Sequence, residues 1–133
     1  RTWVPRVLPA LAGKLSGYAM NVPVQTGSML DLTVAFAEPA VDAEAVNRVF
    51  EAAAEARPDL LAVTWDPIVS SDVRGCRQSL LVDLEATLKA GSRLIKVIGW
   101  HESLGHAARI LDVAALYADL DGAAGASNQE ASR

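Results

Sequence analysis

Hydrophobic and polar side chains alternate most regularly between residues 30 and 36. Asp31, Thr33 and Ala35 occupy the positions between the apolar residues, which are Leu30, Leu32, Val34 and Phe36. Because successive side chains of a β-strand point to opposite faces, this pattern predicts a strand with one face in the core. Shorter or less regular apolar patterns predict four further strands, over residues 15–24, 60–65, 80–84 and 93–100.

Two segments have the apolar spacing of an α-helix. Asp42 is a suitable N-cap for the first helix, which is expected from about Ala43 to Ala56. This helix should end before Pro58, because the residue ahead of a proline avoids α geometry. The second helix is expected to begin near Gly105 and to carry one apolar stripe, formed by Ile110, Val113, Ala114 and Tyr117.

The expected order of elements is strand, strand, helix, strand, strand, strand, helix. Strands that cluster without strict βαβ alternation favour an α+β fold, with a mixed or antiparallel sheet and helices packed on one face. A length of 133 residues suffices for one domain, which is expected over residues 1–121. Residues 122–133 have no apolar periodicity and are expected to form a flexible tail.

Composition and charge argue against several classes of protein. Twelve Lys and Arg residues stand against 16 Asp and Glu residues, a net charge of −4, whereas a nucleic-acid binder needs a clustered basic face. No apolar run approaches the roughly 18 residues that a membrane span needs. The single cysteine, Cys76, cannot form an internal disulfide, so we expect a cytoplasmic protein. The chain begins at Arg1 without methionine, and a processed protein, a trimmed one and a piece of a longer one all remain open.

Titratable side chains gather between residues 101 and 106. The two histidines of HESLGH are five positions apart, about 140° around a helix, whereas the zinc motif HExxH has them four apart on one face. We therefore expect no metal. A carboxylate beside a histidine can set its tautomer for general acid–base catalysis, which makes His101, Glu102 and His106 the candidate catalytic residues. The alternative is a surface role for His101 and a helix-capping role for His106.

A second polar stretch lies between residues 66 and 78. If a pocket lies nearby, Asp72 could hold a polar substrate together with Arg74 or Arg77. The alternative is structural, because the Asp and Ser side chains of DPIVSSD can satisfy the backbone donors of an irregular turn. Cys76 lies between the two arginines, but no histidine is brought to it by the sequence pattern, so a nucleophilic role is not expected.

Three longer stretches stand in order along the chain: GKLSGYAMNVPV followed by LDLTV, then DPIVSSDVRGCRQSLLVD, then LIKVIGWHESLGHAARILDV. Together they resemble the C-terminal catalytic domain of the glyceraldehyde-3-phosphate dehydrogenase family. The resemblance covers the chain from about Val7 to Tyr117 and implies the fold of that domain. It also implies that the dinucleotide-binding domain and the nucleophilic cysteine of the family lie upstream of the matched region.

Two positions differ from the family pattern at ligand-binding residues. By the resemblance, Asn21 stands where the family has an arginine that holds the substrate phosphate, and an amide cannot provide a bidentate cation. The segment with the asparagine that orients the nicotinamide is one residue shorter here, and Ser103 is the nearest candidate for that asparagine. We therefore expect no hydride transfer and no cofactor. The candidate substrate-binding residues are Asn21, Asp72, Arg74 and Ser103.

These observations lead to three hypotheses about function. The first is a repurposed, cofactor-independent enzyme that acts on a small molecule by acid–base chemistry, as an isomerase, cyclase or lyase does. The alternatives are a non-catalytic binding or assembly module and a fragment of a longer NAD-dependent dehydrogenase-like enzyme. Without the dinucleotide-binding domain, the apolar surface that this domain would cover is exposed, and a second copy of the chain could cover it instead. A homodimer is therefore expected under either of the first two hypotheses.

Overall fold

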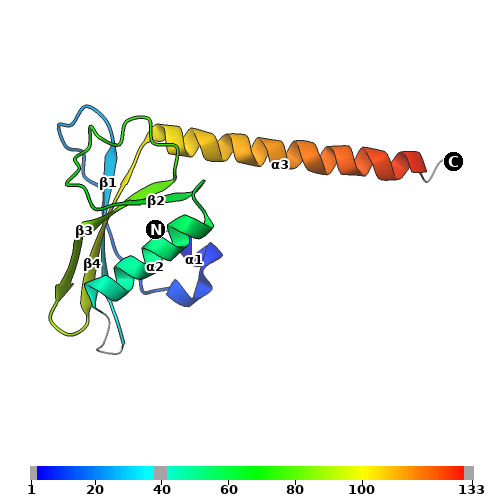
Figure 1. Ribbon diagram of the computed structural model, residues 1–133. Helices are drawn as coiled ribbons and strands as arrows, with labels where there is room; N and C mark the ends of the chain where they lie inside the picture. The colour runs from blue at the N-terminus through cyan, green and yellow to red at the C-terminus, as the bar shows by residue number, and fades with distance from the viewer. Residues whose placement is uncertain (1–2, 38–41, 131–133) are drawn as a thin grey trace.

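The computed structural model describes residues 3–37 and 42–130, without the side chains of residues 121–130. Two short helical segments come first, α1 (Val4–Val7) and η1 (Pro9–Leu11). The remaining elements, shown in Figure 1, are β1 (Ser28–Ala35), α2 (Ala43–Ala56), β2 (Leu61–Thr64), β3 (Leu80–Ala90), β4 (Leu94–His101) and α3 (Ser103–Glu130).

The four strands form one mixed sheet in the order β1-β4-β3-β2. Strand β4 runs antiparallel to both β1 and β3, whereas β2 runs parallel to β3. A tight turn at Gly91 joins β3 to β4, and its φ of +61° is one that glycine adopts readily. The parallel pair needs a longer connection, which residues 65–79 provide. The sheet and its helices confirm the predicted α+β fold class.

The hydrophobic core lies between α2 and one face of the sheet. Four side chains of β3 and β4 are buried at its centre, and partly buried side chains of α2 and β2 surround them. The four are Val82, Leu84, Ile95 and Val97. Each contributes about 1.5–3 kcal/mol by leaving water. Because they sit at alternate positions of two adjacent strands, the period-2 pattern places all four on the same face.

The first long helix matches its predicted bounds. Asp42 caps α2 by accepting a hydrogen bond from the backbone N–H of Ala45 at 2.6 Å. Inside the helix, Asn47 is buried, and its Nδ2 donates to the carbonyl oxygen of Leu84 at 2.8 Å. This polar contact ties α2 to the middle of β3.

The predicted strand over residues 15–24 is wrong. These residues form no strand. Among the described residues, β4 is the one strand that pairs with β1. Large apolar side chains of the segment, among them Tyr18 and Met20, are exposed. An alternating pattern produces a strand only where a neighbouring strand pairs with its backbone groups. Pro23 also has no backbone N–H to donate to such a neighbour.

Strand β3 continues to Ala90, so the predicted end at residue 84 is wrong. Its pairing with β4 shifts register between Asp83 and Leu88 and then resumes. The charged side chains of Glu85 and Lys89 interrupt the apolar pattern, although the backbone still pairs. A side-chain pattern does not reveal a strand boundary that is set by backbone pairing.

Helix α3 begins at Ser103, close to the predicted start, and continues to Glu130. Residues 122–130 are therefore helical, and the division into a domain over residues 1–121 and a flexible tail over residues 122–133 stays a prediction. Alanine has the highest helix propensity of the residue types, and three alanines lie between residues 122 and 127. Figure 1 shows α3 extending away from the sheet. Of the helices described, none has the length and apolar character needed to cross a membrane.

Candidate functional site

The junction of β4 and α3 packs against the loop between β2 and β3. Glu102 lies at this junction, and its carboxylate accepts a hydrogen bond from the backbone N–H of Gly75 at 3.3 Å. Gly75 has a φ of +84°, in the left-handed region that favours glycine. Glu102 therefore holds the loop to the start of α3, and one of its carboxylate oxygens is committed to that contact.

Gly105 determines how closely α3 approaches the same loop. The residue is buried, and a Cβ at this position would overlap the carbonyl oxygen of Gln78. The N–H of Gly105 donates to the carbonyl oxygen of Glu102 at 3.1 Å where the helix begins. The close approach requires glycine here, and it makes the loop and the helix start one packed unit.

The two candidate histidines lie on the outside of this unit. His101 is the last residue of β4, opposite Ser28 of β1, and His106 lies near the start of α3; both are exposed. Neither imidazole has a hydrogen-bond partner among the described residues. No hydrogen bond therefore joins His101, Glu102 and His106 to one another, and their acid–base role stays a prediction.

The four predicted substrate-binding residues lie on separate elements. Asp72 accepts a hydrogen bond from the backbone N–H of Val69 at 2.8 Å, which closes a turn in the loop. Arg74 is exposed in the same loop, Ser103 is the exposed first residue of α3, and Asn21 is exposed ahead of β1. Within the described residues no hydrogen bond joins any two of them. The contact of Asp72 supports its structural interpretation, and substrate binding by the four stays a prediction.

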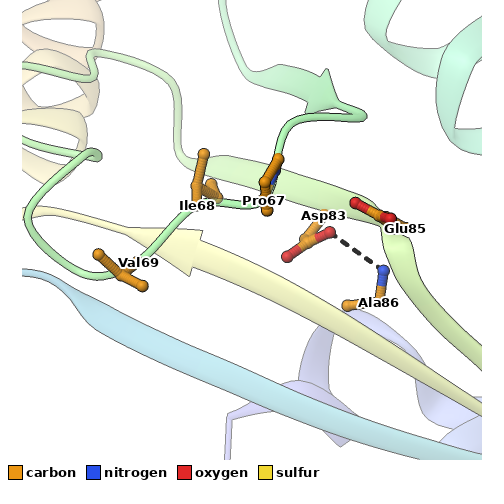
Figure 2. A pocket seen from close by; sticks show the side chains of 6 residues that line it. All are labelled: Pro67, Ile68, Val69, Asp83, Glu85 and Ala86. Carbon is orange, nitrogen blue, oxygen red and sulfur yellow. Dashed lines mark hydrogen bonds between the residues drawn. The ribbon is translucent and has the colours of Figure 1, made fainter.

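A shallow hollow of about 290 Å³ lies where the loop after β2 crosses β3. Figure 2 shows its lining, which is Pro67, Ile68, Val69, Asp83, Glu85 and Ala86. Asp83 is buried, and its Oδ1 accepts a hydrogen bond from the backbone N–H of Ala86 at 3.1 Å. The sequence analysis missed this feature, although a carboxylate inside the apolar run LLVDL was a visible signal. This contact lies where the register of β3 with β4 shifts, so we assign Asp83 a structural role in that irregularity.

A second open hollow, of about 600 Å³, lies between α2 and β2. Two carboxylates of α2, Glu51 and Glu55, lie on its rim with the apolar side chains of β2. Neither hollow includes the candidate residues between 101 and 106. In residues 3–37 and 42–130, no three His, Cys, Asp or Glu side chains are grouped so that they could hold a metal ion.

A network of charged groups anchors α3 at the end of α2. Arg57 donates to both carboxylate oxygens of Asp59, at 3.2 and 3.1 Å, and Arg109 of α3 donates to the carbonyl oxygen of Asp59 at 2.8 Å. The hydrogen bond from Arg57 lowers the pKa of the Asp59 carboxyl, and the same contact raises the pKa of Arg57. The sequence analysis missed this network, because a local pattern gives no signal for a contact between residues 50 positions apart.

Comparison with known families decides what this arrangement is. A family described as "Glyceraldehyde 3-phosphate dehydrogenase, C-terminal domain" matches residues 2–103. The chain belongs to this family. The match covers the sheet and α2 and ends where α3 begins, so the glyceraldehyde-3-phosphate dehydrogenase resemblance drawn from the three sequence stretches is confirmed.

Curated relatives carry the same name. The chain is 42% identical over 112 residues to "Glyceraldehyde-3-phosphate dehydrogenase" of Borreliella burgdorferi, covering 81% of this chain and 33% of the relative. It is 41% identical over 114 residues to "Glyceraldehyde-3-phosphate dehydrogenase 1" of Streptomyces avermitilis, covering 85% of this chain and 34% of the relative. It is 39% identical over 117 residues to "Glyceraldehyde-3-phosphate dehydrogenase" of Geobacillus stearothermophilus, covering 86% of this chain and 35% of the relative. The chain thus spans about a third of the length of these relatives.

Proposed function

We propose that this chain acts by association, as the C-terminal part of a glyceraldehyde-3-phosphate dehydrogenase-type catalytic unit, and that its smallest oligomer is a homodimer. The chain on its own carries out no dehydrogenase reaction. We therefore favour the assembly and fragment hypotheses over a repurposed enzyme. The dehydrogenase activity named for the relatives belongs, in this account, to the assembled unit.

The exposed apolar surface of α3 carries the proposal. The helix packs onto the rest of the chain by its first turns, where Gly105 and Ala108 are buried. Beyond them, every large apolar side chain up to residue 120 is more than half exposed: Ile110, Leu111, Val113, Leu116, Tyr117 and Leu120. All of these positions except Leu111 lie within one arc of about 120° around the helix, and an apolar stripe of this width is typical of a helix face that packs against another element. A further polypeptide supplies the cover that α3 needs.

The length of the relatives supports the same conclusion. Each of the three relatives has about two thirds of its length outside the match with this chain. A polypeptide region of that size offers ample surface to bury a helix such as α3. We therefore infer that the partner of α3 corresponds to this unmatched part of the relatives.

The ligand-binding positions support the absence of dehydrogenase activity in the chain alone. Asn21 lacks the positive charge that the family resemblance assigns to this position for holding phosphate. No reaction is assigned to His101, Glu102 and His106, because Glu102 is committed to Gly75 and neither histidine has a hydrogen-bond partner among the described residues.

Co-expression tests the proposal. The partner is the part of the Geobacillus stearothermophilus enzyme that this chain does not match. The two polypeptides are expected to elute together from a sizing column. Leu116→Glu, which puts a carboxylate in the apolar surface of α3, is expected to separate them. Ala115→Glu adds the same charge at an exposed position but removes little apolar area, so it serves as the control. Separate elution of the unsubstituted pair, or NADH formation by this chain alone from glyceraldehyde 3-phosphate, NAD and phosphate, contradicts the proposal.

A further inference from the structure

Helix α3 is attached to the rest of the chain at three points near its start. The first two are the contacts of Glu102 and Gly105 with the loop between β2 and β3. At the third, one turn further along, Arg109 donates from Nη1 to the backbone carbonyl oxygen of Asp59 at 2.8 Å. Among the described residues, this hydrogen bond is the one furthest along α3 that reaches another element. Beyond it the helix extends away from the sheet (Figure 1).

The two segments that hold α3 are tied to each other. They are the turn after α2 and the end of the loop between β2 and β3, and together they are called here the anchor region, residues 57–60 and 75–80. The carbonyl oxygen of Leu60 accepts a hydrogen bond from the N–H of Ser79 at 2.8 Å. Gln78 donates from Nε2 to the carbonyl oxygen of Pro58 at 3.0 Å. All three attachment points of α3 therefore belong to one connected part of the chain.

The third attachment point limits the tilt of the helix. Glu102 and Gly105 are three positions apart, about 4.5 Å along a helix axis, and both contact the same loop. Two contacts so close together fix where α3 begins but leave it free to tilt. Arg109 adds a contact about 6 Å beyond Gly105, on the other segment of the anchor region. This third contact fixes the direction in which α3 leaves the chain.

The surroundings of Arg109 explain why an arginine suits this position. Its side chain is 24% exposed, and it forms an ion pair from Nε with Asp112 of the same helix at 3.1 Å. The carbonyl oxygen of Asp59 lies just beyond the C-terminal end of α2, whose last turn has no basic residue of its own. A cation is favourable at that end of a helix, and a hydrogen bond from a charged donor is stronger than one from a neutral donor.

Small changes in the direction of α3 have large effects on its apolar stripe. This stripe follows Arg109 directly and consists of Ile110, Val113, Leu116, Tyr117 and Leu120. Leu120 lies about 16 Å beyond Arg109 along the helix, so a tilt of about 20° displaces it by about 6 Å. Helices dock by fitting the side chains of one into the grooves of another, and a displacement of this size is wider than a side chain. The fit of the stripe to a partner therefore depends on the direction of the helix.

We propose that Arg109 is the positioning residue of α3, which fixes the direction of the helix through the carbonyl oxygen of Asp59 and so presents the apolar stripe to the partner polypeptide. For the identity of that partner, this inference rests on the proposed function. The carboxylate of Asp59 has a lesser part, because its Oδ2 lies 4.0 Å from Arg109 and both of its oxygens already accept hydrogen bonds from Arg57. Exposed ion pairs at such distances contribute little.

Distances between two spin labels test the direction of α3 in the chain alone. Arg48→Cys on α2 and Ala115→Cys on α3 place the labels at exposed positions, in a Cys76→Ser background. The labelled chain is expected to give one narrow distribution of distances, which Arg109→Ala broadens or shifts by several ångströms. Asp59→Asn is the matched control, because it keeps the backbone acceptor, and it should leave the distribution unchanged. A distribution that Arg109→Ala does not alter, or one that is broad before this substitution, overturns the inference.

Calorimetric titration with the partner polypeptide tests the effect on association. The partner is the same unmatched part of the Geobacillus stearothermophilus enzyme. Arg109→Ala is expected to weaken binding about tenfold or more, because a smaller fraction of the chains holds α3 in the direction that binds. Arg109→Lys keeps a cationic donor and should recover part of this loss. Asp59→Asn should change binding by less than about twofold, although it removes the ion pair with Arg57.

The two measurements separate positioning from general stability and from the proposed function. If Arg109→Ala and Asp59→Asn weaken binding equally, stability alone controls association and the inference is overturned. If Arg109→Ala changes the label distances but not the affinity, the link to the partner is overturned and the proposed function stands. If the unsubstituted chain does not bind the partner polypeptide, the proposed function is overturned, and the label distances alone decide whether Arg109 directs α3.

Discussion

Glu102 accepts a hydrogen bond from the backbone N–H of Gly75, and this contact joins the start of α3 to the loop between β2 and β3. We expect Glu102→Ala to lower the free energy of unfolding by about 1 kcal/mol, the net value of a typical hydrogen bond. Urea titration measures this loss. His101→Ala removes a neighbouring exposed side chain and should change stability by less than about 0.5 kcal/mol. Equal losses for the two variants would show that the Glu102 contact does not hold the loop.

Gly105 lies too close to Gln78 for any side chain. Gly105→Ala is expected to destabilise the chain by about 1–3 kcal/mol, because the added methyl group forces the helix start and the loop apart. Gly17→Ala is the matched control, since a Cβ at residue 17 meets no other atom within 4 Å. Thermal unfolding of both variants checks the difference. A Gly105→Ala variant as stable as Gly17→Ala refutes the close packing of α3 on this loop.

The ion pair of Asp59 with Arg57 predicts a pH dependence. Because the pKa of Asp59 is lowered in the folded chain, the contact stabilises the fold above the ordinary carboxyl value of 3.8. That contribution is lost as the pH falls through the lowered pKa. Asp59→Asn should therefore be less stable than the wild-type chain at pH 7, and the difference should shrink in strong acid. A difference that stays constant between pH 7 and pH 2 contradicts this assignment.

Asn47 is a buried polar residue of α2 whose Nδ2 donates to Leu84. Asn47→Ala removes this donor and leaves the carbonyl oxygen in the core without it. The expected cost is about 1–3 kcal/mol in the free energy of unfolding. Arg48→Ala, one position along at the exposed surface, should cost less than about 0.5 kcal/mol. Guanidinium titrations of the two variants give the comparison, and a neutral Asn47→Ala would mean that water replaces the contact.

The sequence predicts the fold well where side-chain pattern and backbone agree. Asp42 caps α2, and the strand predicted over residues 30–36 overlaps β1, which spans Ser28–Ala35, because local signals decide a helix cap and an alternating strand. The segment 15–24 has a similar pattern but no strand, since pairing depends on a neighbour that local sequence does not reveal.

The candidate site was harder to predict for the same reason. The sequence indicates that Glu102 and Asp72 are polar and near turns, and both make backbone hydrogen bonds in the structure. It could not indicate that the partner of Glu102 is Gly75, which lies 27 positions away in the chain. The contact between Arg109 and Asp59 has no local signal either, because the two residues lie 50 positions apart in the chain.

The native mass of the purified chain, measured by light scattering, tests most directly the claim that this chain acts by association. The account predicts twice the chain mass of 14.0 kDa at micromolar concentration. A wild-type mass of 14.0 kDa at every concentration up to the millimolar range would contradict it.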